Sequence, residues 1–509
     1  MHRGDSPRPL APLLDAVTGV RVPDAAASLR VRRIVADARQ VEPGDLFVAL
    51  RGHRTDGHRY VGDAVRRGAV AVVVERDVDT AMGRPVLRVP DTRRALAELA
   101  AAWYDRPARR LSLVGITGSF GKTGTLNMLH AILERAGIVA GAIGSDFLGL
   151  RLPGERNEQQ QLTTPDPLDL HEALSRVVDH GGRVCAMEVT SQGLVQRRIH
   201  GLEFAVGIFT CIAPLEHADY HGSFRRYVEA KARFVEHLRP GAPLVYPRGE
   251  RVVGALVAGC RAAPVPCGLG PGAGVRIRRR RRGPAGTRML LEVARPLPRV
   301  DGGEVGPVTV PIELRLLGRS NARNAALAAV AGLCLGAAPE AVREALAAVR
   351  PPPRRLHYER RGRFALLDDT ATHPEALCVL FEVVAGLRRR RLHVVAAIRG
   401  ARGVELNRRY GETIAIWSRT LKIRTLVATS SREAVEPADG VAPEEREAFL
   451  DELRRAGVDA VHRERLDDAL RHALDRVRDG DLLVLLGTQG MHPGAELVRR
   501  WTEGEDRAR

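Results

Sequence analysis

The stretch Leu113-Val-Gly-Ile-Thr-Gly-Ser-Phe-Gly-Lys-Thr123 decides the fold. An apolar strand runs into a glycine loop, and an amphipathic helix follows with Leu126, Leu129 and Leu133 on one side. Glycines let backbone N–H groups curl around phosphate oxygens, and the helix N-terminus adds a favourable dipole. The stretch therefore predicts a nucleotide triphosphate site, formed by Gly118, Ser119, Gly121, Lys122 and Thr123.

The loop has the form T-G-x-x-G-K-T, with Ile116 where the strict Walker spacing has glycine. In such loops the lysine, here Lys122, reaches the outer phosphates, and the hydroxyl of the next residue, here Thr123, ligates Mg²⁺. A phosphate loop does not choose a reaction, because kinases, GTPases and ligases share it. The type of reaction must therefore be inferred from the rest of the chain.

Outward from the loop, strands alternate with helices, which predicts an α/β fold with mostly parallel sheets. We expect three domains: residues 1–109, a central doubly wound domain at 110–350 that carries the loop, and a Rossmann-like domain at 351–509. Three consecutive prolines at 351–353 form a stiff linker between the last two. Residues 268–310, rich in Gly, Pro and Arg, are predicted as an exposed β-meander or loop insert.

The formal charge of +18 does not indicate a nucleic-acid partner. Of the 79 basic residues 76 are arginine, spread along the whole chain, which is typical of a coding bias; only Lys122, Lys231 and Lys422 are lysine. Where arginine would serve, this chain uses it, so a retained lysine indicates chemistry that a guanidinium cannot perform. The six cysteines form no C-x-x-C pair, and no apolar run suits a membrane span or a signal peptide. We expect a cytoplasmic monomer that binds neither nucleic acid nor membrane.

Several further segments, in chain order, resemble the Mur ligases, and most closely their UDP-N-acetylmuramoyl-tripeptide synthetase branch. They lie at residues 37–50, 52–58, 162–168, 187–191, 216–222, 227–231 and 317–324. Each is weak by itself, but the ordered set covers nearly the whole chain. The resemblance implies an enzyme that uses ATP to activate a substrate carboxylate as an acyl phosphate, which the amine of an amino acid then attacks.

The resemblance also implies catalytic roles for Lys122, Glu188, His217 and Lys231. Glu188 would hold Mg²⁺ together with Thr123, and His217 would serve a second metal ion. Lys231 matches a lysine that is carbamylated in the family, so an N6-carboxylysine would add an oxygen ligand. Carbamylation needs an amine that can lose a proton, which arginine cannot supply, and this explains the lysine at 231.

Other matched positions imply binding roles. Asn321 and Asn324 lie in the adenine-side segment, and Arg355 and Asp369 match positions that face ATP. A UDP-linked muramoyl peptide, or a related carboxylate substrate, would contact the matched polar residues His53, Arg54, Thr55, Thr163, Thr164, Thr190, Gln196 and Arg198. The amino acid would bind to the third domain.

Departures from the family pattern leave the substrate open. Phe120 replaces the usual loop asparagine, and the motif Asp-Asn-Pro-Arg, which recognises diaminopimelate, is missing; the aligned stretch reads Thr429-Ser-Ser-Arg-Glu433. Three hypotheses follow. The chain is a peptidoglycan-precursor ligase, a Mur-like ligase of a specialised or natural-product pathway with another carboxylate substrate, or a nucleotide-binding protein that has lost catalysis.

Overall fold

The computed structural model describes residues 6–26, 28–52, 55–78, 82–145, 149–151, 162–213, 222–269, 274–283, 286–350 and 354–506. The chain divides into two compact units. The first comprises Met1–Arg278, Leu291–Val310 and Asn324–Ala345; the second comprises Arg279–Leu290, Pro311–Arg323 and Leu346–Arg509. A search of the described ranges finds no helix that is both long and apolar enough to cross a bilayer.

A four-stranded parallel sheet occupies the N-terminal part of the first unit, in the order β3-β4-β5-β6. Apolar clusters cover both of its faces, which is why its strands read as continuous apolar runs. The elements of this part are β1 (Arg8–Pro9), α1 (Ala11–Leu14), β2 (Arg30–Val31), β3 (Ile34–Val35), β4 (Leu46–Val48), α2 (Val61–Arg66), β5 (Ala71–Val74), β6 (Val86–Arg88) and α3 (Thr92–Trp103).

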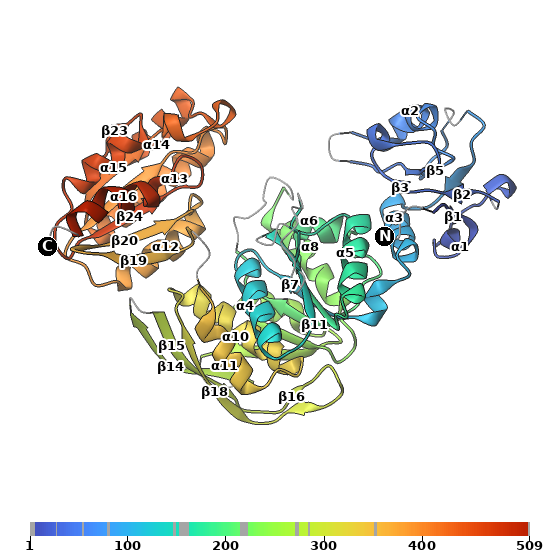
Figure 1. Cartoon of the computed structure of the whole chain (residues 1–509), viewed down its shortest axis with the longest axis horizontal. Helices are drawn as coiled ribbons and strands as arrows, with labels where there is room; N and C mark the ends of the chain where they lie inside the picture. Colours follow the sequence, from blue (N-terminus) through green and yellow to red (C-terminus); the bar gives the residue numbers. More distant parts are fainter. Residues whose placement is uncertain are drawn as a thin grey trace. The chain divides into compact units, whose positions relative to one another are not determined.

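The glycine loop belongs to a second sheet, which has ten strands in the order β18-β15-β14-β13-β12-β11-β7-β10-β8-β9. From β14 to β8 neighbouring strands are parallel, and β9 pairs antiparallel with β8. Helices α4 and α5 lie on opposite sides of β7 (Figure 1). The elements are β7 (Ser112–Thr117), α4 (Lys122–Arg135), β8 (Ala140–Gly144), β9 (Gly149–Arg151), α5 (Pro167–Asp179), β10 (Val184–Val189), α6 (Ser191–Val195), β11 (Phe204–Phe209), α8 (Phe224–Ala232), β12 (Pro243–Pro247), α9 (Arg251–Val257) and β13 (Ala263–Gly268).

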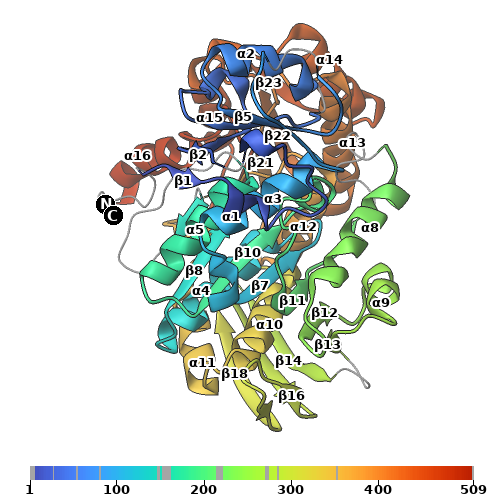
Figure 2. The same cartoon turned by 90° about the vertical axis from the view of Figure 1, so that its right-hand side faces the viewer.

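The arginine-rich stretch continues this sheet as strands and not as a loop. Strands β14 (Val275–Gly283), β15 (Gly286–Val293) and β18 (Val308–Leu314) follow one another in the strand order and lie side by side in both views (Figures 1 and 2). The β-meander alternative of the sequence prediction is therefore confirmed. The remaining elements here are β16 (Leu297–Pro298), β17 (Glu304–Val305), α10 (Arg319–Cys334) and α11 (Pro339–Ala348).

The C-terminal residues form a six-stranded sheet in the order β19-β20-β24-β21-β22-β23. All neighbouring strands are parallel except β19, and apolar clusters cover both faces, as in a doubly wound fold. Its elements are β19 (His357–Arg361), β20 (Phe364–Asp369), α12 (Pro374–Gly386), β21 (Leu392–Ala397), α13 (Val404–Leu421), β22 (Ile423–Thr429), α14 (Pro443–Arg455), β23 (Val461–Arg463), α15 (Leu466–Leu474), β24 (Leu482–Leu486) and α16 (Gly494–Asp506).

The expected fold class is confirmed: each of the three domains is α/β, and both large sheets are mostly parallel. Leu126, Leu129 and Leu133 are all buried on one side of α4, as the helical spacing predicts. Element ends differ by a few residues; the helix expected over 322–335 spans Arg319–Cys334. The domain boundaries at 109/110 and 350/351 stay predictions.

A buried histidine in α5 leads us to predict how the stability of the protein depends on pH. His171 is buried in the apolar core, neither ring nitrogen has a hydrogen-bond partner among the described residues, and burial lowers its pKa from 6.5 to about 4. The unfolded chain takes up a proton near pH 6.5, whereas the folded chain does so only near pH 4. Stability is therefore lost as pH falls through this window, by about 3 kcal/mol at most.

Replacing His171 by leucine should flatten this pH dependence. We expect the urea midpoint of unfolding to fall between pH 7.5 and pH 5 in the wild type, and to fall much less in His171→Leu. The exposed His492 provides the matched control, since His492→Gln should behave like the wild type. An equal fall in both variants would exclude His171 as the cause.

Candidate active site

The phosphate loop folds around two glycines with positive φ, Gly118 at 144° and Gly121 at 86°. A Cβ on Gly118 would lie 2.0 Å from Thr210 Oγ1 and 2.9 Å from the Cys211 carbonyl, so only glycine fits there. Lys122 Nζ donates hydrogen bonds to the carbonyls of Gly118, at 2.8 Å, and Ser119, at 3.0 Å. The lysine thus closes the loop over its own backbone at the start of α4.

Ser119 fixes the loop to two neighbouring elements. Its hydroxyl is 2.8 Å from the Tyr227 hydroxyl on α8 and accepts a hydrogen bond of 2.9 Å from Ala213 N. Its backbone N–H donates to the Cys211 carbonyl at 2.8 Å. The sequence did not indicate the Tyr227 contact, although Tyr227 lies in a segment that resembles the family.

Glu188 lies at the carboxyl end of β10 and is 1% exposed. One carboxylate oxygen, Oε1, accepts hydrogen bonds of 3.0 Å from the Thr123 hydroxyl and from Ser145 N. A Cβ on Gly144 would lie 2.5 Å from the same oxygen, so the small residue leaves room for the carboxylate. The two predicted Mg²⁺ ligands, Thr123 and Glu188, are therefore in direct contact, and both offer the oxygen donors that Mg²⁺ prefers.

Lys231 is not a surface lysine: it is 1% exposed at the end of α8. Its Nζ lies 3.4 Å from Thr117 Oγ1, at the end of β7, and 5.0 Å from the ring centroid of Tyr227. Thr117 Oγ1 in turn donates to the Val189 carbonyl at 2.8 Å, at the end of β10. Lys231 is thus held next to the strand ends that carry the loop and Glu188.

The predicted substrate-side residues of the first unit form one hydrogen-bonded group with Glu188. Thr164 Oγ1 donates to the Glu188 carbonyl at 3.0 Å and accepts from Thr190 N at 3.0 Å. Arg198 donates to the Thr164 carbonyl at 2.7 Å and, through two nitrogens, to Gln196 Oε1 at 2.7 and 3.1 Å. Thr163 Oγ1 is 3.0 Å from Ser145 Oγ.

The two asparagines of the adenine-side segment have different surroundings. Asn324 is buried, and a Cβ on Gly121 would lie 2.7 Å from its Oδ1, so it packs against the loop. Among the described residues its Oδ1 has no hydrogen-bond partner. Asn321 Nδ2 donates to the Leu317 carbonyl at 2.8 Å.

Other predicted residues belong to the second unit, are exposed, or lie outside the described residues. Asp369, at the end of β20 in the second unit, accepts from Leu356 N at 2.6 Å and Ala371 N at 2.7 Å, and burial raises its pKa to about 6. Arg355 and Thr55 are exposed. His53, Arg54 and His217 lie outside the described residues.

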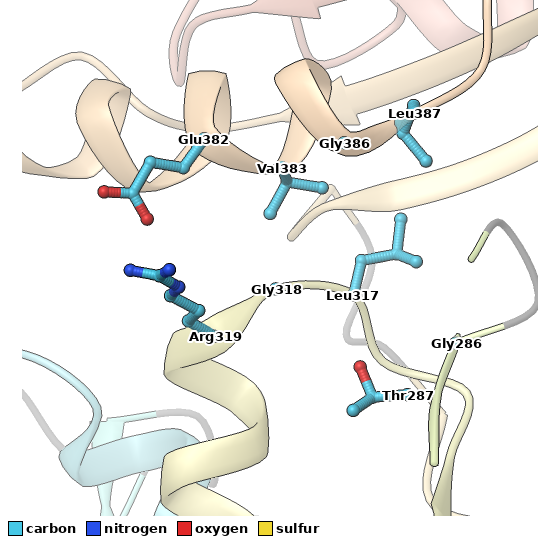
Figure 3. Close-up of a pocket in the computed structure, with 9 residues that line it drawn as sticks. All are labelled: Gly286, Thr287, Leu317, Gly318, Arg319, Glu382, Val383, Gly386 and Leu387. Carbon is cyan, nitrogen blue, oxygen red and sulfur yellow. The ribbon is translucent and has the colours of Figure 1, made fainter. Parts of the chain in front are cut away.

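The second unit contains a pocket of about 50 Å³ lined partly by Leu317, Gly318 and Arg319. Arg319 and Glu382 point toward each other at one end of it (Figure 3). A pocket this small cannot enclose a nucleotide, because ligand sites usually measure ~300–1,000 Å³.

Within the described part of the chain, no three or more His, Cys, Asp and Glu side chains are grouped as a metal site would require. The arrangement around Glu188 is that of a nucleotide-dependent P-loop enzyme: it combines a phosphate loop that carries Lys122, a carboxylate at a strand end and a second, buried lysine.

Three family models match the chain in order: the Mur ligase family, catalytic domain, at residues 30–104; the Mur ligase middle domain, at 116–332; and the Mur ligase, glutamate ligase domain, at 354–489. The UDP-N-acetylmuramoyl-L-alanyl-D-glutamate--2,6-diaminopimelate ligase of Chlorobaculum tepidum is 31% identical, over 94% of this chain and 91% of that protein. The ligase of the same name from Geobacter metallireducens is 35% identical over 74% of this chain and 72% of its own length.

Solved structures show the same fold. A UDP-N-acetylmuramoyl-L-alanyl-D-glutamate--2,6-diaminopimelate ligase superimposes with a TM-score of 0.68 at 19% identity, covering 94% of this chain and 93% of that one. A MurF ligase from Thermotoga maritima in complex with ADP gives 0.60 at 20% identity, covering 94% and 99%. The chain belongs to the Mur ligase family. It is an ATP-dependent amide ligase.

Proposed function

We propose that this ligase joins an amino acid to a carboxylate of the D-glutamate residue of UDP-N-acetylmuramoyl-L-alanyl-D-glutamate, and so extends a peptidoglycan precursor. The observation that carries the proposal is the hydrogen bond between Thr123 and Glu188. Thr164 in turn is hydrogen-bonded to Glu188, Thr190 and Arg198. Residues predicted for the nucleotide and for the carboxylate substrate thus meet at the end of one strand. The relatives named above support the muramoyl dipeptide as the substrate.

In the proposed reaction a substrate carboxylate oxygen attacks the γ-phosphorus of ATP, and ADP leaves. The amine of the amino acid then attacks the acyl carbon, the amide bond forms, and inorganic phosphate departs with the electron pair of the broken C–O bond. Lys122 would exchange its contacts with the Gly118 and Ser119 carbonyls for phosphate oxygens, and so offset the charge that develops during transfer.

Mg²⁺ would be held by Thr123 and Glu188, whose contacting oxygens are hard donors, and it would supply further charge neutralisation. His217 and a carbamylated Lys231 are proposed as ligands of a second ion. The burial of Lys231 supports this role, because an ordinary solvated lysine would not be packed against Thr117 and Tyr227. The substrate carboxylate would be positioned by Thr163, Thr164, Thr190, Gln196 and Arg198. Residues 53–55 would contact the uridine side of the substrate. Asn321, Asn324, Arg355 and Asp369 would contact the nucleotide.

Domain roles are part of the proposal. Residues 1–109 would hold the UDP moiety, 110–350 the ATP, and 351–509 the amino acid. The relatives act on 2,6-diaminopimelate by name, but here the stretch Thr429–Glu433 lacks the Asp-Asn-Pro-Arg motif. This departure favours, as second candidate, a Mur-like ligase with another carboxylate substrate.

A phosphate-release assay tests both candidates. Each amino acid of a panel, with meso-diaminopimelate, L-lysine and L-ornithine included, is combined with UDP-N-acetylmuramoyl-L-alanyl-D-glutamate, ATP and Mg²⁺. We expect phosphate release to depend on both substrates and the product to contain one new amide. Turnover only with other UDP-muramoyl substrates would favour the second candidate, and ATP binding without any turnover would favour a catalytically inactive protein.

A further inference from the structure

The segment that carries Gln196 and Arg198 contains a residue with a strained backbone. Arg197 has a φ of 55°, in the left-handed region that disfavours residues with a Cβ. Its N–H donates to the Leu194 carbonyl at 3.2 Å, just after α6. Conformations of this kind persist only where the surrounding structure imposes them, and they cluster at functional sites. The sequence did not indicate a role for Arg197.

The left-handed turn sends neighbouring side chains in different directions. Arg198 is 8% exposed and donates to the Thr164 carbonyl at 2.7 Å, within the group proposed to position the substrate carboxylate, here called the carboxylate subsite. Ile199 is fully buried in an apolar core. Arg197 is exposed instead, and its Nε lies 2.7 Å from a carboxylate oxygen of Asp91. One turn therefore connects the carboxylate subsite to the start of α3.

Asp91 lies in the N-terminal part of the first unit, where it caps helix α3. Its Oδ1 accepts a hydrogen bond of 3.0 Å from Arg94 N, and its Oδ2 is the atom that contacts Arg197. Helix α3 packs on the four-stranded sheet, because its residue Leu99 lies in the same apolar cluster as Val73 of β5. The ion pair therefore ties the turn at Arg197 to the body of the N-terminal sheet.

A second contact joins the same turn to α3. His200 N donates to the Arg197 carbonyl at 3.0 Å, and His200 Nε2 lies 3.4 Å from Glu98 Oε1, two helical turns beyond Asp91. The Glu98 side chain is 14% exposed and is held in place because it also accepts from Thr18 N at 2.9 Å. Two contacts at separate points of one helix constrain its direction as well as its distance from the turn.

We propose that Arg197 is a positioning residue that sets the distance between the N-terminal domain and the carboxylate subsite. The inference rests on the proposed function, in which residues 1–109 hold the UDP moiety and Arg198 and Thr164 help to position the carboxylate. A substrate that carries both groups binds at two places, and its second contact is effectively intramolecular only if the two places lie at the matching distance. The ion pair with Asp91 holds that distance, so the ligase selects muramoyl peptides that carry the nucleotide.

The test measures how much the covalent link between the two ends of the substrate contributes to binding. The full-length ligase is titrated calorimetrically with UDP-N-acetylmuramoyl-L-alanyl-D-glutamate and with its two fragments, UMP and N-acetylmuramoyl-L-alanyl-D-glutamate 1-phosphate. Two variants remove the ion pair and keep the local structure. Arg197→Asn is chosen because asparagine tolerates the left-handed conformation, and Asp91→Asn because its amide oxygen can still cap α3.

We expect each single variant to bind the whole substrate about fivefold more weakly than the wild type, since a half-exposed ion pair contributes modestly. The affinities for the two fragments should not change, because neither fragment spans both places. A merely structural role would instead weaken the binding of at least one fragment. The double variant Arg197→Asn/Asp91→Asn should bind the whole substrate no more weakly than either single variant, because both side chains act through one contact.

Arg135→Gln is the matched control, because Arg135 at the end of α4 forms an exposed ion pair with Glu344 of α11. It should bind the whole substrate as the wild type does, and all variants should unfold close to the wild-type urea midpoint. Unchanged affinity for the whole substrate in both single variants, a matching loss of affinity for either fragment, or additive losses in the double variant would each overturn the inference. Phosphate release by the wild type reports on the proposed function separately from these outcomes.

Discussion

Lys231→Arg is expected to lower kcat by about 10²–10³-fold while ATP still binds. Arginine keeps the positive charge of Lys231 but cannot be carbamylated, so it cannot supply the oxygen ligand proposed for a second metal ion. If the charge alone mattered, arginine would preserve most of the activity. Steady-state phosphate release measures kcat. The intact mass of the wild type shows whether one carbon dioxide has been added.

Lys422→Arg is the matched control for Lys231→Arg, since Lys422 follows α13 and is the third lysine of the chain. It should leave kcat unchanged. Because Lys231 is fully buried, the larger arginine could disturb packing, so Lys231→Met, which has a similar length and no charge, serves as a second variant. Wild-type activity should also fall in buffer stripped of carbon dioxide and return with bicarbonate. Full activity of both variants would contradict the role proposed for Lys231.

Lys122→Ala is expected to reduce kcat/KM by about 10³-fold or more, with the larger part in kcat. The alanine removes the side chain that we propose contacts the outer phosphates. It also leaves the Gly118 and Ser119 carbonyls without the amine that they accept from in the structure, so the loop itself loses two hydrogen bonds.

A measurement of ADP affinity separates these two effects of Lys122→Ala. If the loop stays folded, ADP affinity should fall much less than kcat, because the contact proposed for Lys122 is strongest with the transferring phosphoryl group. A fall in ADP affinity as large as the fall in kcat/KM would instead indicate a collapsed loop. Retained turnover would exclude Lys122 from catalysis.

The part of the site that could be predicted from sequence is local. Gly118, Gly121 and Lys122 lie within one turn, and the period of the buried leucines fixes the helix that follows. The contact of Thr123 with Glu188 joins residues 65 apart and depends on β10 pairing beside β7, a register that no local pattern encodes. The resemblance to the family suggested this pair; periodicity did not.

The sequence could not predict which member of a common residue type has unusual burial or contacts. Arg399 is one of 76 arginines, and only the fold shows that it is half-buried and that its Nη1 donates to Thr372 Oγ1 at 3.0 Å. The same holds for His393, which lies 3.0 Å from both Asp481 and Thr425 at the amino edge of the C-terminal sheet. These three resemble a hydrolytic triad, but the side chains of His393 and Asp481 are at most 1% exposed and lie at the amino edge, whereas open α/β sheets bind ligands at the carboxyl edge. Their contacts instead hold the starts of the strands together.

The hydrogen bonds from Lys122 to the Gly118 and Ser119 carbonyls affect the heat capacity change of nucleotide binding. Because these hydrogen bonds already fold the loop, a nucleotide that binds would exchange hydrogen-bond partners with Lys122 and would not have to order a flexible segment. Calorimetric binding of ADP should accordingly show a small negative heat capacity change, in proportion to the surface that the nucleotide itself covers, without the larger value that accompanies coupled folding.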